Sequence, residues 1–384
     1  MFLATFGSGV GTYLAAVALT VDVFDRTGSG AWVSALLIAD FLPVILIGLL
    51  FAPLVDRLSR RRLLIVSDLV RAILFCLLPF AGSATVIVAL AAVVGIATGF
   101  FRPAVYAGMP NLVEDSRLPE ATSLFHTVEN LTWMVGPVLG GLLIAAQGPD
   151  LAYWLNAATF VASAALLARI PAARLQAGEV ESRGHWRDIG DGIAVVLRSK
   201  PLLVVLIVWN VVMLGNAAVN VAEVVLAKVA LGAGNIGFGV LVAAGGLGLT
   251  LGSFASGTAV DRIGLGRLYA LGIAMMAAGY GIAAASPSIY VAVPAVVVAA
   301  FGNGAAVVCN ALFVQRGAPD ELRGRAFTVI MSSNYVLLGT GMVAAGALTD
   351  AFGARWVWGG AAGAYLVAAL LAVALAPKRN EALA

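Results

Sequence analysis

Long apolar stretches follow one another along the chain, and each is about as long as a helix that crosses a membrane. A spanning helix needs about 20 apolar residues, and short polar turns such as residues 27–30 and 148–150 separate stretches of this length. Because the apolar positions are continuous and do not alternate with polar ones, the pattern favours helices over the strands of a membrane barrel. It predicts twelve spans, at residues 1–24, 31–55, 62–81, 85–108, 121–147, 150–170, 201–231, 236–259, 267–286, 288–312, 324–351 and 353–376.

The composition indicates that lipid is the main solvent of these spans. Hydrophobic residues make up 61% of the chain and charged residues 11%, whereas a soluble domain carries about 25% charged residues. We therefore expect an all-α membrane protein. The first apolar stretch has no basic segment before it and no cleavage-site pattern after it, so we interpret it as a span and not as a signal peptide.

One polar stretch divides the chain near its middle. Residues 171–200 form the longest polar segment, and we expect a cytoplasmic linker with a short surface helix there. The predicted organisation has an N-terminal six-helix bundle at residues 1–170, the linker, and a C-terminal six-helix bundle with a short tail at residues 201–384.

Lys and Arg residues lie mostly on one side of the predicted spans. If residue 1 is cytoplasmic, 18 of the 23 Lys and Arg residues fall in cytoplasmic segments, three on the opposite side and two within spans. Cytoplasmic loops of membrane proteins carry such an excess of positive charge. We expect a multi-pass protein of the cell membrane with both termini in the cytoplasm.

The two halves of the sequence repeat each other at a constant shift. Asp56-Arg57 follows the second predicted span, and Asp261-Arg262 follows the eighth, 205 residues later. A shift that holds over several spans indicates a duplicated unit. The sequence therefore predicts two pseudo-symmetric six-helix bundles, related by an axis along the membrane normal. The same shift relates three glycine pairs, namely Gly136 and Gly341, Gly141 and Gly346, and Gly148 and Gly353.

At these positions the chain resembles the major facilitator superfamily of transporters. The family signature between the second and third spans is G-x-L-x-D-R-x-G-R-[KR], and residues 52–61 match it except that Ala52 and Ser59 replace its glycines. The second half keeps a degenerate copy between the eighth and ninth spans. The residues that carry the two copies are Asp56, Arg57, Arg60, Arg61, Asp261 and Arg262.

The resemblance implies a gating role for this loop. In the family, the acidic residue at the position of Asp56 locks the outward-facing state by meeting the start of a helix in the other half. A carboxylate near a helix N-terminus gains roughly 0.3–1 kcal/mol, so a contact of this kind can bias two states. The arginines have a second interpretation, as anchors that set the topology of the chain.

A second motif and two short segments narrow the resemblance to one branch of the family. The fifth predicted span contains Gly136-Pro137-Val138-Leu139-Gly140-Gly141, which resembles a Gly-Pro motif associated in the family with antiport and efflux. Residues 67–72 and 100–104 are similar to the branch that includes macrolide-efflux and enterobactin-exporter-like proteins. The resemblance covers the whole chain and implies transport of a small molecule.

Several polar residues lie inside predicted spans, where a charged group costs roughly 2.5–3.5 kcal/mol on insertion scales. Such groups persist only when they are paired, hydrated or protonated, so each is a candidate for proton coupling or for the substrate cavity, or alternatively for a structural pair between helices. Asp68 and Arg71 share a helix face and read as a structural ion pair. The candidates for coupling or substrate binding are Asp40, Arg102, Glu129, Glu223, Asn216 and Asn220.

These observations predict a secondary transporter and not an enzyme. No nucleotide-binding loop G-x-x-x-x-G-K-[ST], metal-ligand spacing or catalytic constellation occurs in the sequence. We expect proton-coupled efflux of small amphipathic molecules by alternating access, with a dedicated siderophore or metabolite exporter, an importer, or a membrane sensor as alternatives. The expected partners are a small-molecule substrate, protons and the lipid bilayer. We expect a monomer that uses no cofactor, metal or nucleic acid.

Overall fold

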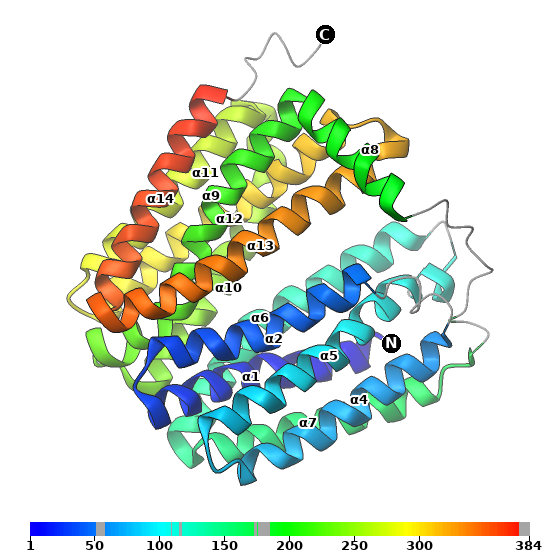
Figure 1. The fold of residues 1–384 in the computed structure, drawn as a ribbon, viewed down its shortest axis with the longest axis vertical. Helices are drawn as coiled ribbons and strands as arrows, with labels where there is room; N and C mark the ends of the chain where they lie inside the picture. Colours follow the sequence, from blue (N-terminus) through cyan, green and yellow to red (C-terminus); the bar gives the residue numbers. More distant parts are fainter. Residues whose placement is uncertain (51–57, 109, 115–116, 173–174, 176–184, 376–384) are drawn as a thin grey trace. The chain divides into compact units, whose positions relative to one another are not determined.

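The computed structural model is helical, and twelve helices among the residues it describes are long and apolar enough to cross a membrane, as the sequence predicts. The described residues are all except 51–57, 109, 115–116, 173–174, 176–184 and 376–384. The α-helices (Figure 1) are α1 Phe2–Thr27, α2 Gly30–Leu50, α4 Arg60–Leu77, α5 Ala84–Gly108, α6 Leu118–Gln147, α7 Pro149–Ala168, α8 His185–Arg198, α9 Lys200–Val225, α10 Gly234–Ile263, α11 Leu265–Ala285, α12 Ile289–Gly317, α13 Asp320–Phe352 and α14 Ala354–Leu375.

Residue contacts group the chain into two compact units. The first consists of Met1–Glu179 with Ala233–Ala243, and the second of Val180–Gly232 with Ala244–Ala384. Within the first unit, α1 packs on α6 and α7, and α4 packs on α5 and α7. Within the second, α9 packs on α13 and α14, and α11 packs on α12 and α14. The helix pairings of one half therefore recur in the other, as the sequence repeat predicts.

Aromatic clusters confirm the repeat at the level of side chains. In the first unit, Phe75 lies 6.3 Å from Tyr153 and 5.7 Å from Phe160, measured between ring centroids. In the second, the Tyr280 ring lies 5.3 Å from Trp358 and 5.4 Å from Tyr365. Each residue of the second cluster stands 205 positions after its counterpart. Such ring pairs contribute about 0.5–1.5 kcal/mol of stability beyond the burial of their surface. Aromatic contacts therefore join α4 to α7 in the first half and α11 to α14 in the second.

Matching turns join the last two spans of each half. Gly148 has φ 76° and donates its N–H to Ile144 O at 2.9 Å, while Gly353 has φ 81° and donates to Thr349 O at 2.9 Å. A positive φ strains any residue with a Cβ atom. Glycine is therefore required at both equivalent positions.

Two arginines satisfy equivalent carbonyl groups from different helices. Arg26, in the last turn of α1, donates to Ala81 O at 3.0 Å, and Arg355, in α14, donates to Ser286 O at 2.6 Å. Ala81 and Ser286 are 205 residues apart. Carbonyl groups at a helix end have no hydrogen-bond partner within the helix. In each half an arginine supplies the missing donor. The duplicated halves have kept the contact while changing the residue that makes it.

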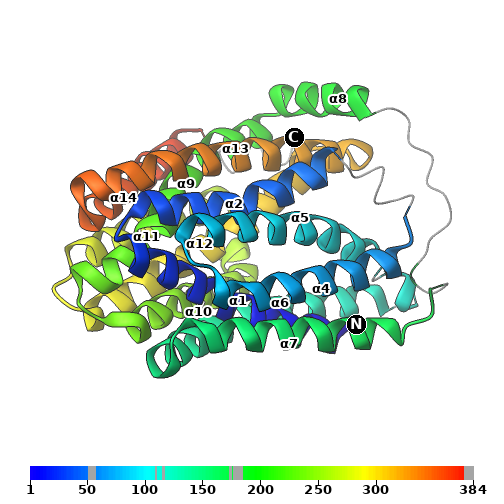
Figure 2. The ribbon, with the colours of Figure 1, turned by 60° about the horizontal axis from the view of Figure 1, so that its bottom comes forward.

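The polar segment between the halves contains the expected short helix, α8, which lies along α13 (Figure 2). A Cβ atom added to Gly192 of α8 would lie 2.8 Å from Arg325 O of α13. Close contact of this kind fixes α8 on the second unit.

Glycine also governs the packing of α10 on α12, and it yields a first prediction. A Cβ atom on Gly252 would overlap the Phe301 carbonyl oxygen, whereas one on Gly245 of the same helix would meet open space. We expect the free energy of unfolding of the Gly252→Ala variant to be about 1–3 kcal/mol lower than that of Gly245→Ala, because the added methyl group overpacks the contact between the helices. The thermal unfolding midpoints of both purified variants measure this difference. Equal midpoints would contradict the close approach of the two helices.

Candidate functional site

A cavity of about 280 Å³ lies inside the first unit and gathers charged side chains from four helices. Asp40 comes from α2, Arg71 from α4, Arg102 from α5 and Glu129 from α6. Three of these are candidates from the sequence, and the fold brings them to one space. Hydroxyl and aromatic groups complete much of the wall, namely Thr5, Ser8, Thr12, Tyr13, Phe41, Phe75, Phe101, Phe125 and Phe160.

Arg102 links the acidic and phenolic groups of the cavity. Its side chain reaches the hydroxyl of Tyr13 on α1. The electrostatic interaction of the Asp40 carboxylate with Arg102 is stronger than its interaction with Arg71. Tyr13 also lies within electrostatic range of Glu129. The cavity is therefore a connected set of charges and not a row of isolated pairs.

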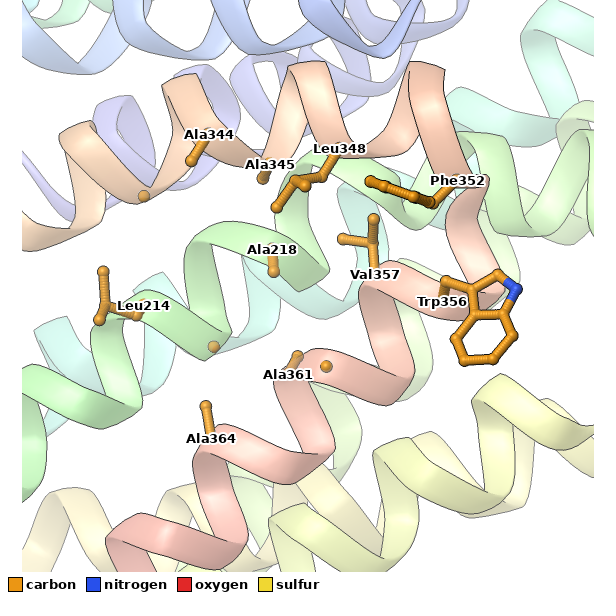
Figure 3. A pocket seen from close by; sticks show the side chains of 13 residues that line it. Leu214, Ala218, Ala344, Ala345, Leu348, Phe352, Trp356, Val357, Ala361 and Ala364 are labelled. Atoms are coloured by element: carbon orange, nitrogen blue, oxygen red, sulfur yellow. The ribbon is translucent and has the colours of Figure 1, made fainter.

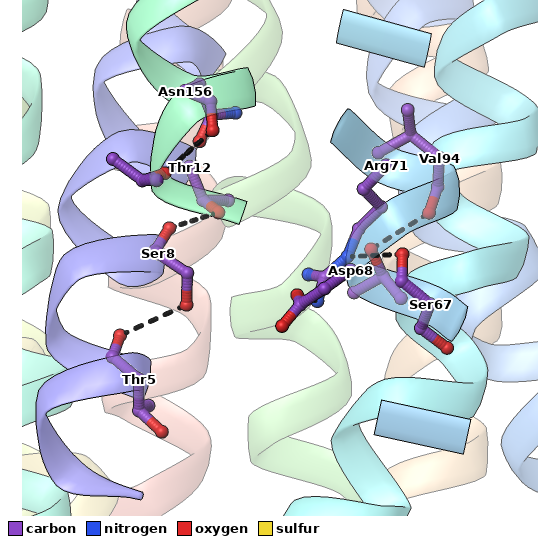
Figure 4. A network of polar contacts seen from close by, with 10 residues as sticks. Thr5, Ser8, Thr12, Ser67, Asp68, Arg71, Val94 and Asn156 are labelled. Atoms are coloured by element: carbon purple, nitrogen blue, oxygen red, sulfur yellow. Dashed lines mark hydrogen bonds and ion pairs between the residues drawn. The ribbon is translucent and has the colours of Figure 1, made fainter. Parts of the chain in front are cut away.

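Arg71 is held in place by an ion pair with Asp68 (Figure 4) and by contacts with two aromatic rings. Its Nη2 lies 2.5 Å from Asp68 Oδ1, and the two side chains are 5% and 0% exposed. The guanidinium carbon lies 4.1 Å from the ring centroid of Phe101 and 4.3 Å from that of Phe160. A cation over an aromatic face is attracted by the ring quadrupole. The predicted ion pair is confirmed, with its arginine at the cavity wall.

Sequence reasoning missed the position of Arg71 in this wall. The i, i+3 spacing from Asp68 suggested only a structural pair, because spacing defines a helix face but not what that face meets. A signal was present in Phe101, which stands next to the cavity candidate Arg102 and contacts Arg71.

A series of hydroxyl groups on α1 forms another side of the cavity (Figure 4). Thr12 donates to Ser8 O at 2.7 Å, and Ser8 donates to Thr5 O at 3.5 Å. Each hydroxyl proton is thus used within the helix, which leaves the oxygen lone pairs as acceptors for a group inside the cavity.

The candidates on α9 lie in other surroundings. Asn216 accepts a hydrogen bond of 2.8 Å from the Tyr365 hydroxyl, which ties α9 to α14. Glu223 is close enough to Tyr280 of α11 to influence it electrostatically. Asn220 is exposed. These residues belong to the second unit.

The signature arginines lie at the start of α4. Arg60 donates to Leu175 O at 3.1 Å, and Arg61 donates to Ala168 O at the end of α7. Cations near the last carbonyl groups of a helix are stabilised by its dipole. Asp56 and Arg57 lie outside the described residues. In the second half, Asp261 and Arg262 are exposed in the last turn of α10.

The Gly-Pro motif allows α6 to approach its neighbours closely. A Cβ atom on Gly136 would lie 2.6 Å from the Tyr13 Cβ, and one on Gly140 would lie 2.7 Å from Leu14 O, both on α1. Pro137 lies within α6. Gly141 faces residues 235 and 239, which are grouped with the first unit. The motif therefore packs against the helix that carries Tyr13.

A second hollow, of about 410 Å³, lies in the second unit and is apolar (Figure 3). Small residues of α9, α13 and α14 form its floor, including Ala218, Ala344 and Gly360. Exposed Phe352 and Trp356 stand at one end. Because its side chains offer little beyond carbon, this groove has no means of handling protons.

Comparisons with known proteins show which family the sequence matches. A family model described as Major Facilitator Superfamily matches residues 1–222 and 210–383. Multidrug efflux pump Tap of Mycolicibacterium fortuitum is 27% identical over 372 residues, which cover 92% of this chain and 89% of that protein. Macrolide efflux protein A of Streptococcus pyogenes is 25% identical over 223 residues, which cover 53% of this chain and 52% of that protein.

Solved structures share the fold. A bacterial homologue of the human lysosomal transporter Spinster, in an inward-facing and occupied conformation, superposes with a TM-score of 0.79. The match covers 99% of this chain and 96% of that chain at 14% sequence identity. At this identity the likeness concerns the fold alone.

The buried ion pair yields a second prediction. Asp68→Ile or Arg71→Met alone leaves an unpaired buried charge and should destabilise the protein by about 3–5 kcal/mol, whereas replacing both partners is often neutral. The second half carries Ile273 and Met276 at the equivalent positions, so the double variant should recover most of the lost stability. Unfolding midpoints of the three variants in detergent test this. A double variant no more stable than the single ones would argue against the pair.

Proposed function

The chain belongs to the major facilitator superfamily, and we propose that it exports small amphipathic molecules across the cell membrane in exchange for protons. It acts as a monomer by alternating access, with both termini and the linker in the cytoplasm. The efflux names of the relatives and the Gly136-Pro137 motif support the direction of transport. The charge balance of the first-half cavity supports proton coupling, and it is the observation that carries the proposal.

That balance leaves one carboxylate in excess. Among the described residues that line the cavity, Arg71 is paired with Asp68, and Arg102 is the other cation beside Asp40 and Glu129. An uncompensated charge in a span costs roughly 2.5–3.5 kcal/mol on insertion scales, so one of the two carboxylates lowers that cost by binding a proton. We choose Asp40 because Arg102 and Arg71 lie within electrostatic range of it, so the carboxylate that remains after proton release has positive charges nearby that stabilise it. Release of this proton on the cytoplasmic side completes the exchange.

The signature loops supply the switch between states. Arg60 and Arg61 bind carbonyl groups at residues 175 and 168 of the same unit, so they hold the start of α4 in place. This leaves the acidic residues of the two copies, Asp56 and Asp261, to make the contact that is formed in one state and broken in the other. A carboxylate can do so at a helix N-terminus.

Transport into everted membrane vesicles tests the proposal. In vesicles that contain the full chain, an inside-acid proton gradient should drive accumulation of erythromycin or ethidium, and a protonophore should abolish it. Adding either compound should release protons from the vesicle lumen. If no compound in a panel of drugs, dyes and siderophores shows proton-dependent uptake or proton release, the antiport proposal is wrong.

Asp40 gives the third prediction. Asp40→Asn should lower proton-driven uptake by about tenfold or more, equivalent to roughly 1.4 kcal/mol of lost coupling, because the amide cannot carry the proton. Exchange of labelled for unlabelled compound without a gradient should persist. Asp150→Asn, on an exposed residue in the first turn of α7, is the matched control. Full proton-driven uptake by Asp40→Asn would assign this carboxylate a structural role.

A further inference from the structure

The sequence repeat lets the second half be compared with the first, position by position. The four charged residues of the first-half cavity have uncharged counterparts 205 positions later. These counterparts are Gly245 for Asp40, Met276 for Arg71, Val307 for Arg102 and Asn334 for Glu129. At these positions the second half therefore has the same fold without the charges.

Asn334 is unusual among these counterparts because it is polar, buried and without a partner. Its side chain is 2% exposed, and neither Oδ1 nor Nδ2 makes a hydrogen bond with any residue that the structure describes. Asn310 of α12 is 9% exposed, and its Oδ1 is also open. The Oδ1 atoms of Asn210 on α9 and Asn303 on α12 are buried and open as well. Together these four asparagines are called the amide cluster below.

The first half shows where the cluster lies. The counterparts of Asn210, Asn303, Asn310 and Asn334 are Thr5, Thr98, Val105 and Glu129. All four counterparts line the charged cavity of the first half. Because the helix pairings recur in the second half, the amide cluster occupies the place that corresponds to this cavity.

Direct contacts in the second unit agree with this placement. Asn210 Nδ2 donates to Ser333 Oγ at 2.6 Å, which joins α9 to α13 beside Asn334. Seven residues farther along α13, a Cβ atom on Gly341 would lie 2.8 Å from the Cβ of Ala217, itself seven residues after Asn210. Seven residues are close to two helical turns. Asn210 and Asn334 therefore stand at the same level on facing helix surfaces.

Open amide atoms in a membrane span disfavour the folded state, because neither lipid nor protein replaces the hydrogen bonds they make with water. Asn216 shows the alternative, since its amide accepts a hydrogen bond from Tyr365. Four amides at one place have atoms without a hydrogen-bond partner among the described residues. A ligand that forms hydrogen bonds with these atoms therefore accounts for them.

We propose that the amide cluster binds an uncharged, hydroxyl-bearing part of the transported molecule, such as a sugar substituent. The proposal rests on the export function proposed above and names the cargo chemistry of the second half. Hydroxyl groups fit because they donate to the four open Oδ1 atoms and also accept from the open Nδ2 of Asn334. An uncharged group fits because the charged positions of the first-half cavity are neutral in the second half.

Stability measurements give the first part of the test and need no ligand. Asn334→Leu and Asn310→Leu remove open amides, so the unfolding midpoint of the full chain in lipid nanodiscs should rise, by about 2 °C or more. Asn216→Leu is the matched control, and its midpoint should fall because a paired amide is lost. A fall in both Asn334→Leu and Asn310→Leu would show that these amides have structural partners, and the proposal would be overturned.

Ligand binding gives the second part. The probes are 4-methylumbelliferyl β-D-glucoside and its tetraacetyl form, which keeps the ring system but has no hydroxyl donors, and nanodiscs avoid sugar-based detergents. Fluorescence anisotropy should show that the wild-type chain binds the glucoside at least about tenfold more tightly, the effect of one or two hydrogen bonds. Asn334→Leu should remove this preference.

The outcomes of the binding experiment are decisive in either direction. Equal binding of the two probes, no binding of the glucoside, or an unchanged preference in Asn334→Leu would overturn the assignment of hydroxyl recognition to the cluster. Because binding is measured without a proton gradient, a failure of proton-driven transport leaves this result unaffected. The cargo assignment and the antiport mechanism can thus fail separately.

Discussion

The bilayer core offers neither water nor screening ions to the groups that enter it, and most described polar contacts follow from this restriction. Hydroxyl groups of α1 donate to carbonyl groups of their own helix. Asp68 and Arg71 form an ion pair, and Arg26 and Arg355 donate to carbonyl groups at helix ends. Polar groups that depart from this rule do not stabilise the fold. The unequal charges of the first-half cavity and the open amides of the second half are such departures, which is why both are assigned to transport.

The duplicated halves separate what the fold requires from what function requires. Aromatic clusters, the glycine turns and the carbonyl groups that accept from Arg26 and Arg355 recur at a shift of 205 residues, although the residue types often differ. These features hold helices together, so the contacts recur even where the residue types differ. The cavity positions have diverged from Asp, Arg and Glu to Gly, Val, Met and Asn. A duplicated bundle can change its inner polar groups because they carry little of the packing, and the two halves are then free to bind different partners.

The sequence predicts the spans well because their length and apolar content are fixed by the membrane. The seventh predicted span, 201–231, corresponds to Lys200–Ala230, and the ninth, 267–286, to Leu265–Ala285. Helix rotation is harder to infer. For Asn216 the sequence leaves a cavity position and a pair between helices both open, and the structure shows a hydrogen bond to Tyr365, a residue 149 positions away. Arg71 was read as a structural partner of Asp68, yet it also lines the cavity. Spacing along one helix defines a face, whereas the neighbour of that face depends on contacts between distant segments.

The two kinds of polar site differ in their effect on the charge that crosses the membrane. A carboxylate that binds a proton changes the net charge of its cavity by one unit, whereas an amide that binds a hydroxyl group changes none. With an uncharged cargo, each returning proton moves one charge, and the membrane potential adds about 2.3 kcal/mol per 100 mV to the driving force. A singly cationic cargo exchanged for one proton would move no net charge, so only the pH gradient would drive it. Under the proposed mechanism, a neutral amide cluster combined with a proton-binding carboxylate would give the exporter access to both components of the proton gradient.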